Sequence, residues 1–471
     1  MIPRKHDSRS FSSQGFPCAR RPAIWPPARE PYSEHGGFRM QKTYTVYAYR
    51  WMVLFVFALL NGVIQLDWIT FAPVTVDAMS LYGVSAFWIV LLSMSFMLVY
   101  LVMSVPASYI IGRYGIRIGV GIGAVLTGVF GYVRGMAGDS YAAVCLAQFA
   151  LAAAQPFIMN AITEVAAEWF PINERATASG ITALFQFLGI IVAMAATRPI
   201  AEMFLPAGST ALTLPAMKSM LIIYGYVSIV AAVLFILFAR DKPPTPPDAE
   251  SAEARYGMFE GLRHLFRQRD MIYLLLVFFI GLGMFNAITT FVDLILAGKG
   301  YKAGGHEAGD IGALMMVAGV LGAIVVPILS DKFRKRKLFM VSCMLGLIPG
   351  LVGLTFASSY GLLLISSGIF GFFFMGAAPI GYQYAAEVSH PAPESTSQGM
   401  IVLSGQISGV IFITLMAILG HVTIEAMADA NRAESTITLT PFMIGFIALA
   451  VVNVVLSLLM KESALIKEDA A

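Results

Sequence analysis

The chain has 471 residues, of which 58% are hydrophobic and only 13% are charged, and its net charge is +3. A soluble domain carries about 25% charged residues, so a soluble chain of this length would lack the polar surface that water requires. The small net charge gives no indication of nucleic-acid binding. Three cysteines without a CxxC motif indicate neither a disulfide framework nor a metal site. Lipid is therefore the expected solvent for most of the chain.

Residues 1–45 form a polar N-terminal tail that lacks the apolar region of a signal peptide. Met40 is followed directly by a plausible alternative start of the protein. We expect the tail to be a disordered segment or the product of a start codon placed too early, and we assign it no function.

Continuous apolar runs of about twenty residues, the length of a membrane-spanning helix, fill most of the remaining chain. An N-terminal half, 46–239, and a C-terminal half, 271–461, contain six runs each. Between them, residues 240–270 form a linker rich in proline and charge with one short amphipathic helix, and residues 462–471 form a tail. The sequence predicts an all-α integral membrane protein with twelve transmembrane helices. The runs are 51–74, 87–111, 116–135, 141–167, 176–197, 217–239, 271–297, 309–330, 337–357, 360–386, 396–419 and 440–460.

Basic residues predict the orientation of these helices, because cytoplasmic loops carry an excess of Lys and Arg. The junction after the eighth run holds five basic residues between 332 and 337, the junction after the second holds Arg113 and Arg117, and the linker adds more. All of them fall on one side if both termini are cytoplasmic. We therefore expect a multi-pass protein of the cell membrane with cytoplasmic termini.

Residues of the same kind recur about 220 positions apart, which indicates that the two halves are structural repeats. The pairs are Pro106 and Pro327 (327 − 106 = 221), Pro156 and Pro379 (223), Glu168 and Glu387 (219), and Gln186 and Gln406 (220). Parallel six-helix halves related by an axis along the membrane normal are an arrangement of secondary transporters. The pattern thus favours two pseudo-symmetric halves.

The segment DKFRKRK, 331–337, resembles the cytoplasmic loop that major facilitator proteins carry between spans 8 and 9. In that family an Asp of the loop pairs with Arg and latches two helices. The first-half copy keeps Arg113 and Arg117 but has Gly112 where Asp is expected. The resemblance implies the major facilitator fold and a latch in the second half, and it leaves a first-half latch in doubt.

The likeness narrows to one branch over about 46–420. LDWITF in the first span, AQPFIMN and WFPINERATA in and after the fourth, and GFFFMGAAPIGYQYAAEVSHP with STSQGMIVLSGQISG in the tenth and eleventh carry it. Together they resemble the feline leukaemia virus subgroup C receptor family, whose members move haem, choline, ethanolamine or related metabolites. The family's choline-site residues fall on Trp68, Gln155 and Gln406. A Tyr of choline-moving members is replaced by Asn286, which weakens the case for choline itself.

Asp67 and Trp68 stand out in the first span without reference to any family. A charge in mid-membrane costs about 2.5–3.5 kcal/mol on insertion scales, so Asp67 is expected to face a cavity or a partner. It is a candidate counter-ion for a cationic substrate or a proton site; the alternative is a carboxylate in a watery outer vestibule. Trp68 offers a π face that attracts ammonium groups, or it is an interfacial packing residue.

Other polar residues of the spans complete the candidate site. Gln155 and Gln406 suit a hydroxyl or carbonyl of a substrate, with hydrogen bonding between helices as the alternative. Secondary candidates for the substrate cavity are Asn61, Gln65, Thr289 and Asp293. Candidates for ion pairs of a cytoplasmic gate or latch are Glu164, Glu168, Arg175, Glu387, Asp331, Arg334, Arg336, Arg113 and Arg117.

These observations favour a secondary transporter that moves a small, polar, cationic metabolite by alternating access, with the lipid bilayer as its surroundings. Proton coupling through Asp67 is a hypothesis. The alternatives are export of haem or porphyrin, and a receptor or sensor of the same fold that transports nothing. No GxxxxGK[ST] motif and no nucleophile–base or metal constellation occurs in the spans. We expect no enzyme, no cofactor, no metal and no nucleic-acid partner.

Overall fold

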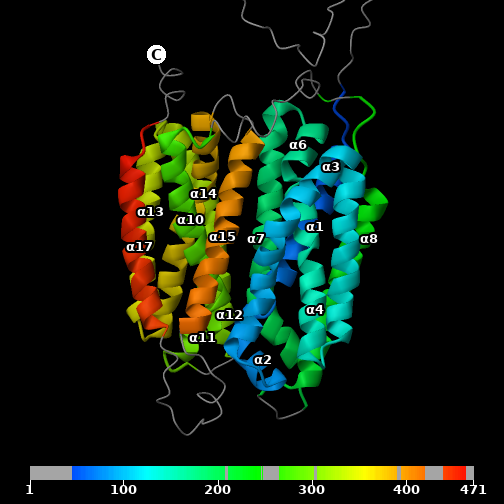
Figure 1. Cartoon of the computed structure of the whole chain (residues 1–471), viewed down its shortest axis with the longest axis vertical. Helices are drawn as coiled ribbons and strands as arrows, with labels where there is room; N and C mark the ends of the chain where they lie inside the picture. The colour runs from blue at the N-terminus through cyan, green and yellow to red at the C-terminus, as the bar shows by residue number, and fades with distance from the viewer. Residues whose placement is uncertain are drawn as a thin grey trace, which may run out of the picture. The chain divides into compact units, whose positions relative to one another are not determined.

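The protein is described from a computed structural model, shown in Figure 1. The structure describes residues 45–206, 211–245, 247, 265–301, 305–389, 394–419 and 439–462. The N-terminal tail, the amphipathic helix expected in the linker and the residues after 462 lie outside these ranges. All regular structure within them is helical. The expectation of an all-α membrane protein is thus confirmed.

The first half is built from eight α-helices and one short 3-10 helix. They are α1 (Arg50–Ile69), η1 (Ala72–Val74), α2 (Thr75–Tyr82), α3 (Ala86–Met136), α4 (Tyr141–Ala152), α5 (Ala154–Met159), α6 (Ile162–Trp169), α7 (Ile172–Glu202) and α8 (Leu214–Phe238). The described part of the second half contains α10 (Arg269–Thr290), α11 (Val292–Ala297), α12 (His306–Phe333), α13 (Arg336–Phe356), α14 (Tyr360–Ser389), α15 (Glu394–Leu419) and α17 (Thr440–Leu459).

Eleven helical stretches in the described ranges are long and apolar enough to cross a membrane. One of them, α3, has 51 residues and includes Gly115, whose φ of 84° and ψ of 176° are not helical. A crossing needs only about 20 residues, so α3 contains two spans that join at Gly115. Positive φ costs glycine nothing because it has no Cβ. With α3 divided there, the structure holds the twelve expected spans.

Helix contacts repeat between the halves as the sequence offsets predict. In the first half α1 packs on α7 and α3 packs on α8; in the second α10 packs on α15 and α13 packs on α17. Between the halves, α7 contacts α12 and α3 contacts α15, which are again equivalent pairs. The two halves therefore share one internal packing and meet along two matching seams.

The first and seventh spans are each interrupted near the same end of the bundle. The first passes from α1 through η1, with Pro73 inside the 3-10 turn, into α2. The seventh breaks at Phe291, between α10 and α11. Figure 1 shows α2 and α11 at one end of the bundle, opposite the end where α17 finishes, and we call it the far end. The other end, where the described chain begins and finishes, is called the terminal end.

Candidate functional site

One face of α1 carries three of the predicted site residues. Asn61, Gln65 and Trp68 stand at positions i, i+4 and i+7, a spacing that places side chains on the same side of a helix. All three are buried in the protein rather than turned to lipid. Trp68 Nε1 donates to the carbonyl oxygen of Ser93 on α3 at 3.1 Å. The polar edge of the indole is thus held by the protein, and its ring faces are the part that could contact a ligand.

The fourth span meets this face through its short middle segment, α5. Gln65 Nε2 contacts Met159 Sδ at 3.7 Å, and α1 and α5 pack against each other. Gln155 lies one helical turn before Met159 and is also buried. Because the first and fourth spans run in opposite directions, Gln155 is expected at the level of Trp68, one turn beyond Gln65.

The seventh span presents a matching row from the second half. Asn286, Thr289 and Asp293 stand at i, i+3 and i+7, although the break at Phe291 separates Asp293 from the other two. Asn286 Nδ2 donates to the carbonyl oxygen of Gly405 at 3.4 Å. Gln406 follows on α15 and is half-buried. The structure therefore brings Asn286 next to the segment of Gln406, as the sequence suggested.

The two rows are equivalent under the internal repeat. Asn286 corresponds to Gln65 (286 − 65 = 221) and Thr289 to Trp68 (289 − 68 = 221). Each half thus contributes polar or aromatic residues at the same depth of the same span. Such symmetric placement around the seam between the halves is the arrangement in which transporters of this kind bind substrates.

Three of these side chains hold buried polar atoms without a hydrogen-bond partner among the described residues. They are Oε1 of Gln65, Oε1 of Gln155 and Oγ1 of Thr289. A buried polar group left unpaired costs about 1–3 kcal/mol, so proteins normally satisfy it. The unpaired oxygen atoms of Gln65, Gln155 and Thr289 are groups whose hydrogen bonds a ligand or water would complete.

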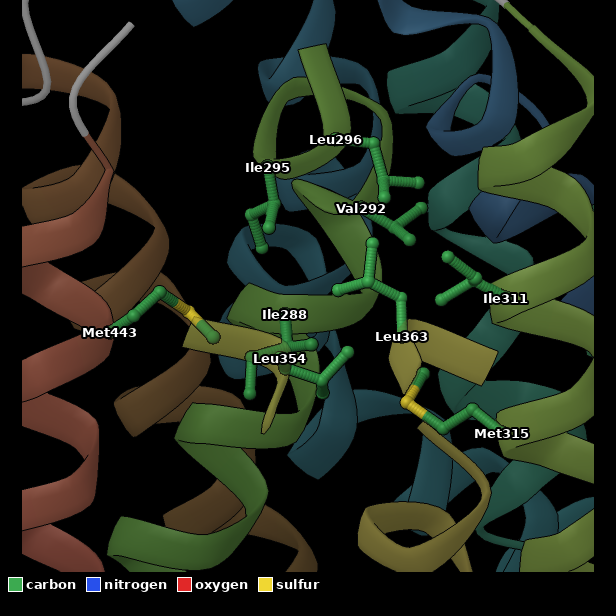
Figure 2. Close-up of a pocket in the computed structure, with 9 residues that line it drawn as sticks. All are labelled: Ile288, Val292, Ile295, Leu296, Ile311, Met315, Leu354, Leu363 and Met443. Atoms are coloured by element: carbon green, nitrogen blue, oxygen red, sulfur yellow. The ribbon is translucent and has the colours of Figure 1, made fainter. Parts of the chain in front are cut away.

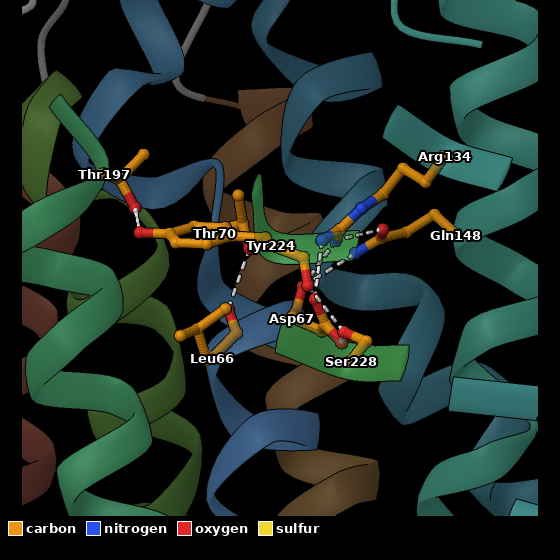
Figure 3. Close-up of polar contacts among 8 residues, drawn as sticks. All are labelled: Leu66, Asp67, Thr70, Arg134, Gln148, Thr197, Tyr224 and Ser228. Atoms are coloured by element: carbon orange, nitrogen blue, oxygen red, sulfur yellow. Dashed lines mark hydrogen bonds and ion pairs between the residues drawn. The ribbon is translucent and has the colours of Figure 1, made fainter. Parts of the chain in front are cut away.

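Asp67 points away from this face, into the interior of the first half (Figure 3). Its Oδ1 pairs with Arg134 Nη2 at 2.6 Å, and both side chains are fully buried. Its Oδ2 accepts a hydrogen bond from Ser228 Oγ at 2.8 Å. The carboxylate that the sequence offered as a counter-ion for a substrate thus has a cationic partner inside the protein. Its role as a direct substrate contact stays a prediction, and this geometry gives it no support.

Arg134 also holds the backbone where α1 ends. Its Nη1 donates to the carbonyl oxygen of Asp67 at 3.0 Å and to Gln148 Oε1 at 2.9 Å, while Gln148 Nε2 donates to the same Asp67 carbonyl at 3.2 Å. A cation at a helix C-terminus is favourable because the last carbonyls carry partial negative charge. Arg134 therefore fixes the last turn of α1, and with it Trp68.

A close approach of α3 and α8 makes this network possible. A Cβ added to Gly131 would lie 2.8 Å from Ser228 Cβ and Oγ and 3.7 Å from Asp67 Oδ2. Small residues let membrane helices come together without a hydrophobic driving force. Any larger residue at 131 would displace Ser228 from the carboxylate.

Charged and polar contacts join the two halves at the far end. Asp293 Oδ2 accepts the backbone N–H of Val76 at 2.8 Å, and Asp293 is 2% exposed. A second connection runs across α7: Arg198 pairs with Asp77 at 2.6 Å and with Glu202 at 2.9 Å, and His306 Nε2 lies 3.1 Å from Glu202 Oε2. These contacts tie α2 and α7 of the first half to α11 and α12 of the second. Asp293 thus lies at the contact between the two halves at the far end.

Several predicted latch residues find partners at the terminal end. Arg336 Nε donates to Glu387 Oε1 at 3.3 Å and Arg336 Nη1 to Ser330 Oγ at 3.3 Å. Arg175 Nε donates to the carbonyl oxygen of Phe170 at 3.2 Å, and Arg113 Nη1 to Tyr109 Oη at 2.8 Å. Glu164 and Glu168 are half-buried on α6 and Arg334 is exposed, whereas the side chain of Asp331 lies outside the description. Of the predicted latch residues, Arg336 and Glu387 thus form an ion pair, and their role as a latch stays a prediction.

Two acidic residues cap equivalent helices at this end. Asp241, just after α8, accepts the backbone N–H of Arg117 at 3.0 Å, where the third span begins. Glu462, just after α17, accepts the backbone N–H groups of Arg336 and Lys337 at 2.6 and 3.1 Å, where the ninth span begins. The two acids are related by the repeat (462 − 241 = 221). Each half thus places a carboxylate after its last span at the start of its third span, in the first half independently of the Asp that is absent at position 112.

The second half contains an enclosed apolar pocket at the place that the charged network occupies in the first (Figure 2). It is lined by nine apolar side chains: Ile288, Val292, Ile295, Leu296, Ile311, Met315, Leu354, Leu363 and Met443. No polar group faces it, so it has the character of a packing defect rather than of a substrate site.

The sequence alone did not identify the partner of Asp67 or the acceptor of the backbone N–H of Arg117. Arg134 was assigned to the end of the third span and Asp241 to a charged linker, and neither was considered as a partner for a helix far away in sequence. The repeat could have found Asp241, because it and Glu462 follow equivalent spans. No pattern pointed to Arg198, Glu202 or His306.

Comparison with known proteins agrees with this architecture. The sequence profile of the Major Facilitator Superfamily matches residues 57–413 and 295–466. The structure is similar to a bacterial homologue of the human lysosomal transporter Spinster in an inward-facing conformation, with a TM-score of 0.65, 17% identity, and 90% of this chain and 97% of that one covered. It is also similar to the nucleoside transporter NupG, with a TM-score of 0.63 at 12% identity, covering 87% and 99%.

Sequence relatives point to one branch of the superfamily. Solute carrier family 49 member A3 of Danio rerio is 32% identical over 394 residues, which cover 81% of this chain and 80% of the relative. The choline/ethanolamine transporter FLVCR2 of Homo sapiens is 27% identical over 376 residues, covering 77% and 70%. The choline/ethanolamine transporter FLVCR1 of Felis catus is 28% identical over 378 residues, covering 78% and 67%. The chain belongs to the Major Facilitator Superfamily and is a membrane transporter related to the FLVCR choline/ethanolamine transporters.

Proposed function

We propose that this transporter moves a small cationic amine of the choline or ethanolamine kind through a site between α1, α5, α10 and α15. The observation that carries the proposal is the buried face of α1, where Trp68 stands one turn from Gln65. A π face attracts ammonium groups, and amides that lack partners suit the hydroxyl of an amino alcohol. The names of the relatives FLVCR1 and FLVCR2 support the same substrate class.

The second half would complete the site with Asn286, Thr289 and Gln406. These residues provide hydrogen-bonding groups and no second aromatic ring. A cation would therefore be held by one π face, which contributes about 0.5–2 kcal/mol. We infer a preference for substrates that also form hydrogen bonds over bare quaternary ammonium ions.

The ion pair of Asp67 with Arg134 would serve the site indirectly. It fixes the turn of α1 that carries Trp68, and it pairs the charge of Asp67 within the first half. Coupling of transport to protons through Asp67 stays a prediction. If it holds, Asp67→Asn abolishes any dependence of uptake on a pH gradient; an unchanged dependence in a folded variant would discard it.

Basic residues support an orientation with both termini in the cytoplasm. Arg113 and Arg117, the basic cluster of 332–337 and Arg240 all lie toward the terminal end, where an excess of positive charge marks the cytoplasmic side. The far end, joined by Asp293 and Val76, would then face outward and would open when substrate exchanges there.

Counterflow of labelled substrate in proteoliposomes tests the proposal. Vesicles loaded with unlabelled choline or ethanolamine should accumulate the labelled compound through the wild-type protein. Trp68→Ala should reduce the rate about tenfold, because 1.4 kcal/mol corresponds to a factor of ten, and Trp68→Phe should retain part of it. Trp88→Ala on α3, a half-exposed tryptophan outside the site, is the control.

Three outcomes would overturn parts of this proposal. Equal rates in Trp68→Ala and wild type would remove the π face from the site. Counterflow of haem, without counterflow of any amine, would show that the substrate is haem and not an amine. A folded protein with no counterflow of any compound, but with ligand-dependent stabilisation, would favour a receptor or sensor.

A further inference from the structure

A surface groove between the third and sixth spans is separate from the site described above. It is lined from α3 by Arg117, Ile118, Gly121, Ile122, Val125 and Leu126, and from α8 by Ile236. The space over these side chains, counted out to the open surface of the bundle, is about 770 Å³. Several of its apolar side chains are half exposed, among them Ile118 at 53% and Val125 at 49%. Since they belong to membrane-spanning helices, they face lipid rather than water.

The length of the groove matches one leaflet of a bilayer. From Arg117 to Leu126, the last residue of α3 that lines the groove, is nine residues (126 − 117 = 9), or roughly 13 Å at 1.5 Å per residue. Half of a hydrocarbon core about 30 Å thick is close to this value. The groove thus begins at the terminal end and finishes near the middle of the membrane, as an acyl chain does.

A positive charge lies where the groove begins. Arg117 lines the groove itself, and the carboxylate of Asp241 accepts its backbone N–H at 3.0 Å. Arg240, which precedes Asp241, lies instead over the Tyr49 ring, 4.6 Å from its centroid. The carboxylate of Asp241 caps the start of the third span, and Arg117 is the cation that lines the groove. Each basic residue near a membrane surface attracts anionic headgroups by about 1 kcal/mol.

We propose that this groove binds an anionic phospholipid, with one acyl chain along α3 and the phosphate at Arg117. Gly121 gives the groove its depth, because an added Cβ there meets nothing within 4 Å. A leucine at this position would therefore fill the groove without disturbing the helices. The inference does not depend on the identity of the transported substrate.

Native mass spectrometry and thermal unfolding in detergent, with phosphatidylglycerol and phosphatidylcholine as probes, test whether the groove binds an anionic phospholipid. The wild-type protein should bind phosphatidylglycerol about fivefold more tightly, the ratio that about 1 kcal/mol gives, and should be stabilised by it. Arg117→Gln should bind both lipids equally. Gly121→Leu should lose both. Glycerol phosphate, which offers the headgroup charge without a chain, should neither bind nor stabilise.

Matched variants separate the groove from general effects of charge and lipid. Arg113→Gln removes an exposed arginine one turn away whose guanidinium lies over Tyr109 and Tyr114. Gly445→Leu adds the same side chain to an exposed, open position of α17. Both controls should keep the preference. Loss of the preference in Arg113→Gln, its survival in Arg117→Gln, or unchanged lipid binding in Gly121→Leu would overturn the proposal.

Discussion

The two halves of the bundle have side chains of opposite chemistry at equivalent interior positions. In the first half, Asp67, Arg134 and Tyr224 belong to a fully buried polar network (Figure 3). The equivalent positions in the second half are Ile288, Leu354 and Met443 (288 − 67 = 221, 354 − 134 = 220, 443 − 224 = 219). These three side chains line the apolar pocket of Figure 2. One half is pinned by directional bonds, whereas the other is packed loosely by non-directional contacts.

The difference teaches that the repeat conserves shape more strictly than chemistry. Helix contacts and breaks in the first and seventh spans match, and so do the acidic caps at the starts of the third and ninth. The interiors need not match, because a buried ion pair and apolar packing of similar volume can be nearly equal in stability. Unlike apolar packing, the ion pair is directional, and it fixes the position of the last turn of α1 beside Trp68.

The largest expected effect comes from removing one partner of the ion pair. Arg134→Leu installs the side chain of the second half but leaves Asp67 unpaired and buried. We expect a loss of about 3–5 kcal/mol in the free energy of unfolding, measured by denaturant titration in detergent. Arg113→Leu, at an exposed arginine, should change it by less than about 0.5 kcal/mol. Equal losses in the two variants would show that the network contributes no special stability.

A double replacement tests the comparison itself. Asp67→Ile combined with Arg134→Leu gives the first half the residues of the second at both positions. Because no unpaired charge remains, the double variant should recover much of the stability that Arg134→Leu loses. The coupling energy in a double-mutant cycle should be about 0.5–3 kcal/mol. Additive losses would mean that the two side chains act independently, contrary to their 2.6 Å contact.

A smaller effect is expected where the halves meet. Asp293→Ala removes the acceptor for the backbone N–H of Val76, a bond to a charged group worth about 1.5–3 kcal/mol. The far end should then open more often. In a background without the native cysteines, Thr289→Cys should react faster with a membrane-impermeant thiol reagent from that side.

The matched control for this prediction is Asp293→Asn, whose side-chain carbonyl can still accept the hydrogen bond. It should label at a rate close to that of the parent protein. Labelling that is equally slow in all three proteins would show that the Asp293 contact does not hold the far end closed.

The smallest expected effect is a gain from filling the apolar pocket. Val292→Ile adds one methylene to its lining and should stabilise the protein by up to about 0.8 kcal/mol. The same change at Val317, which is 44% exposed on α12, should have no measurable effect on unfolding. A loss of 1 kcal/mol or more at Val292 would indicate overpacking, and the second half would then be as tightly packed as the first.

Much of the fold followed from the sequence because hydropathy and repeat spacing act over long stretches. Twenty-residue apolar runs predicted the spans, and the offset near 220 predicted two halves. The sequence placed the junction of the second and third spans at 112–115, but it did not show that the helix continues through the junction and turns at Gly115, since hydropathy does not report the backbone angles of one residue.

The candidate site could be predicted from the sequence only in part. Asn61 and Gln65 were predicted because they are polar residues within an apolar span, Trp68 because of its π face and a family resemblance, and Gln155, Gln406 and Asn286 because of that resemblance. The partner of Asp67 was missed, because periodicity within one helix says nothing about which residue of another helix it meets. A buried Arg at the end of an apolar run, such as Arg134, is the signal that such a partner exists.

The most direct test of the central claim is choline and ethanolamine binding to two variants, measured by calorimetry on the purified protein. The claim is that Trp68 holds the cation and that the charge of Asp67 is used within the first half. It predicts that Trp68→Ala weakens binding about tenfold, while the double variant Asp67→Ile with Arg134→Leu binds within a few fold of wild type. Binding that is lost in the folded double variant but retained in Trp68→Ala would contradict the account and make Asp67 the counter-ion.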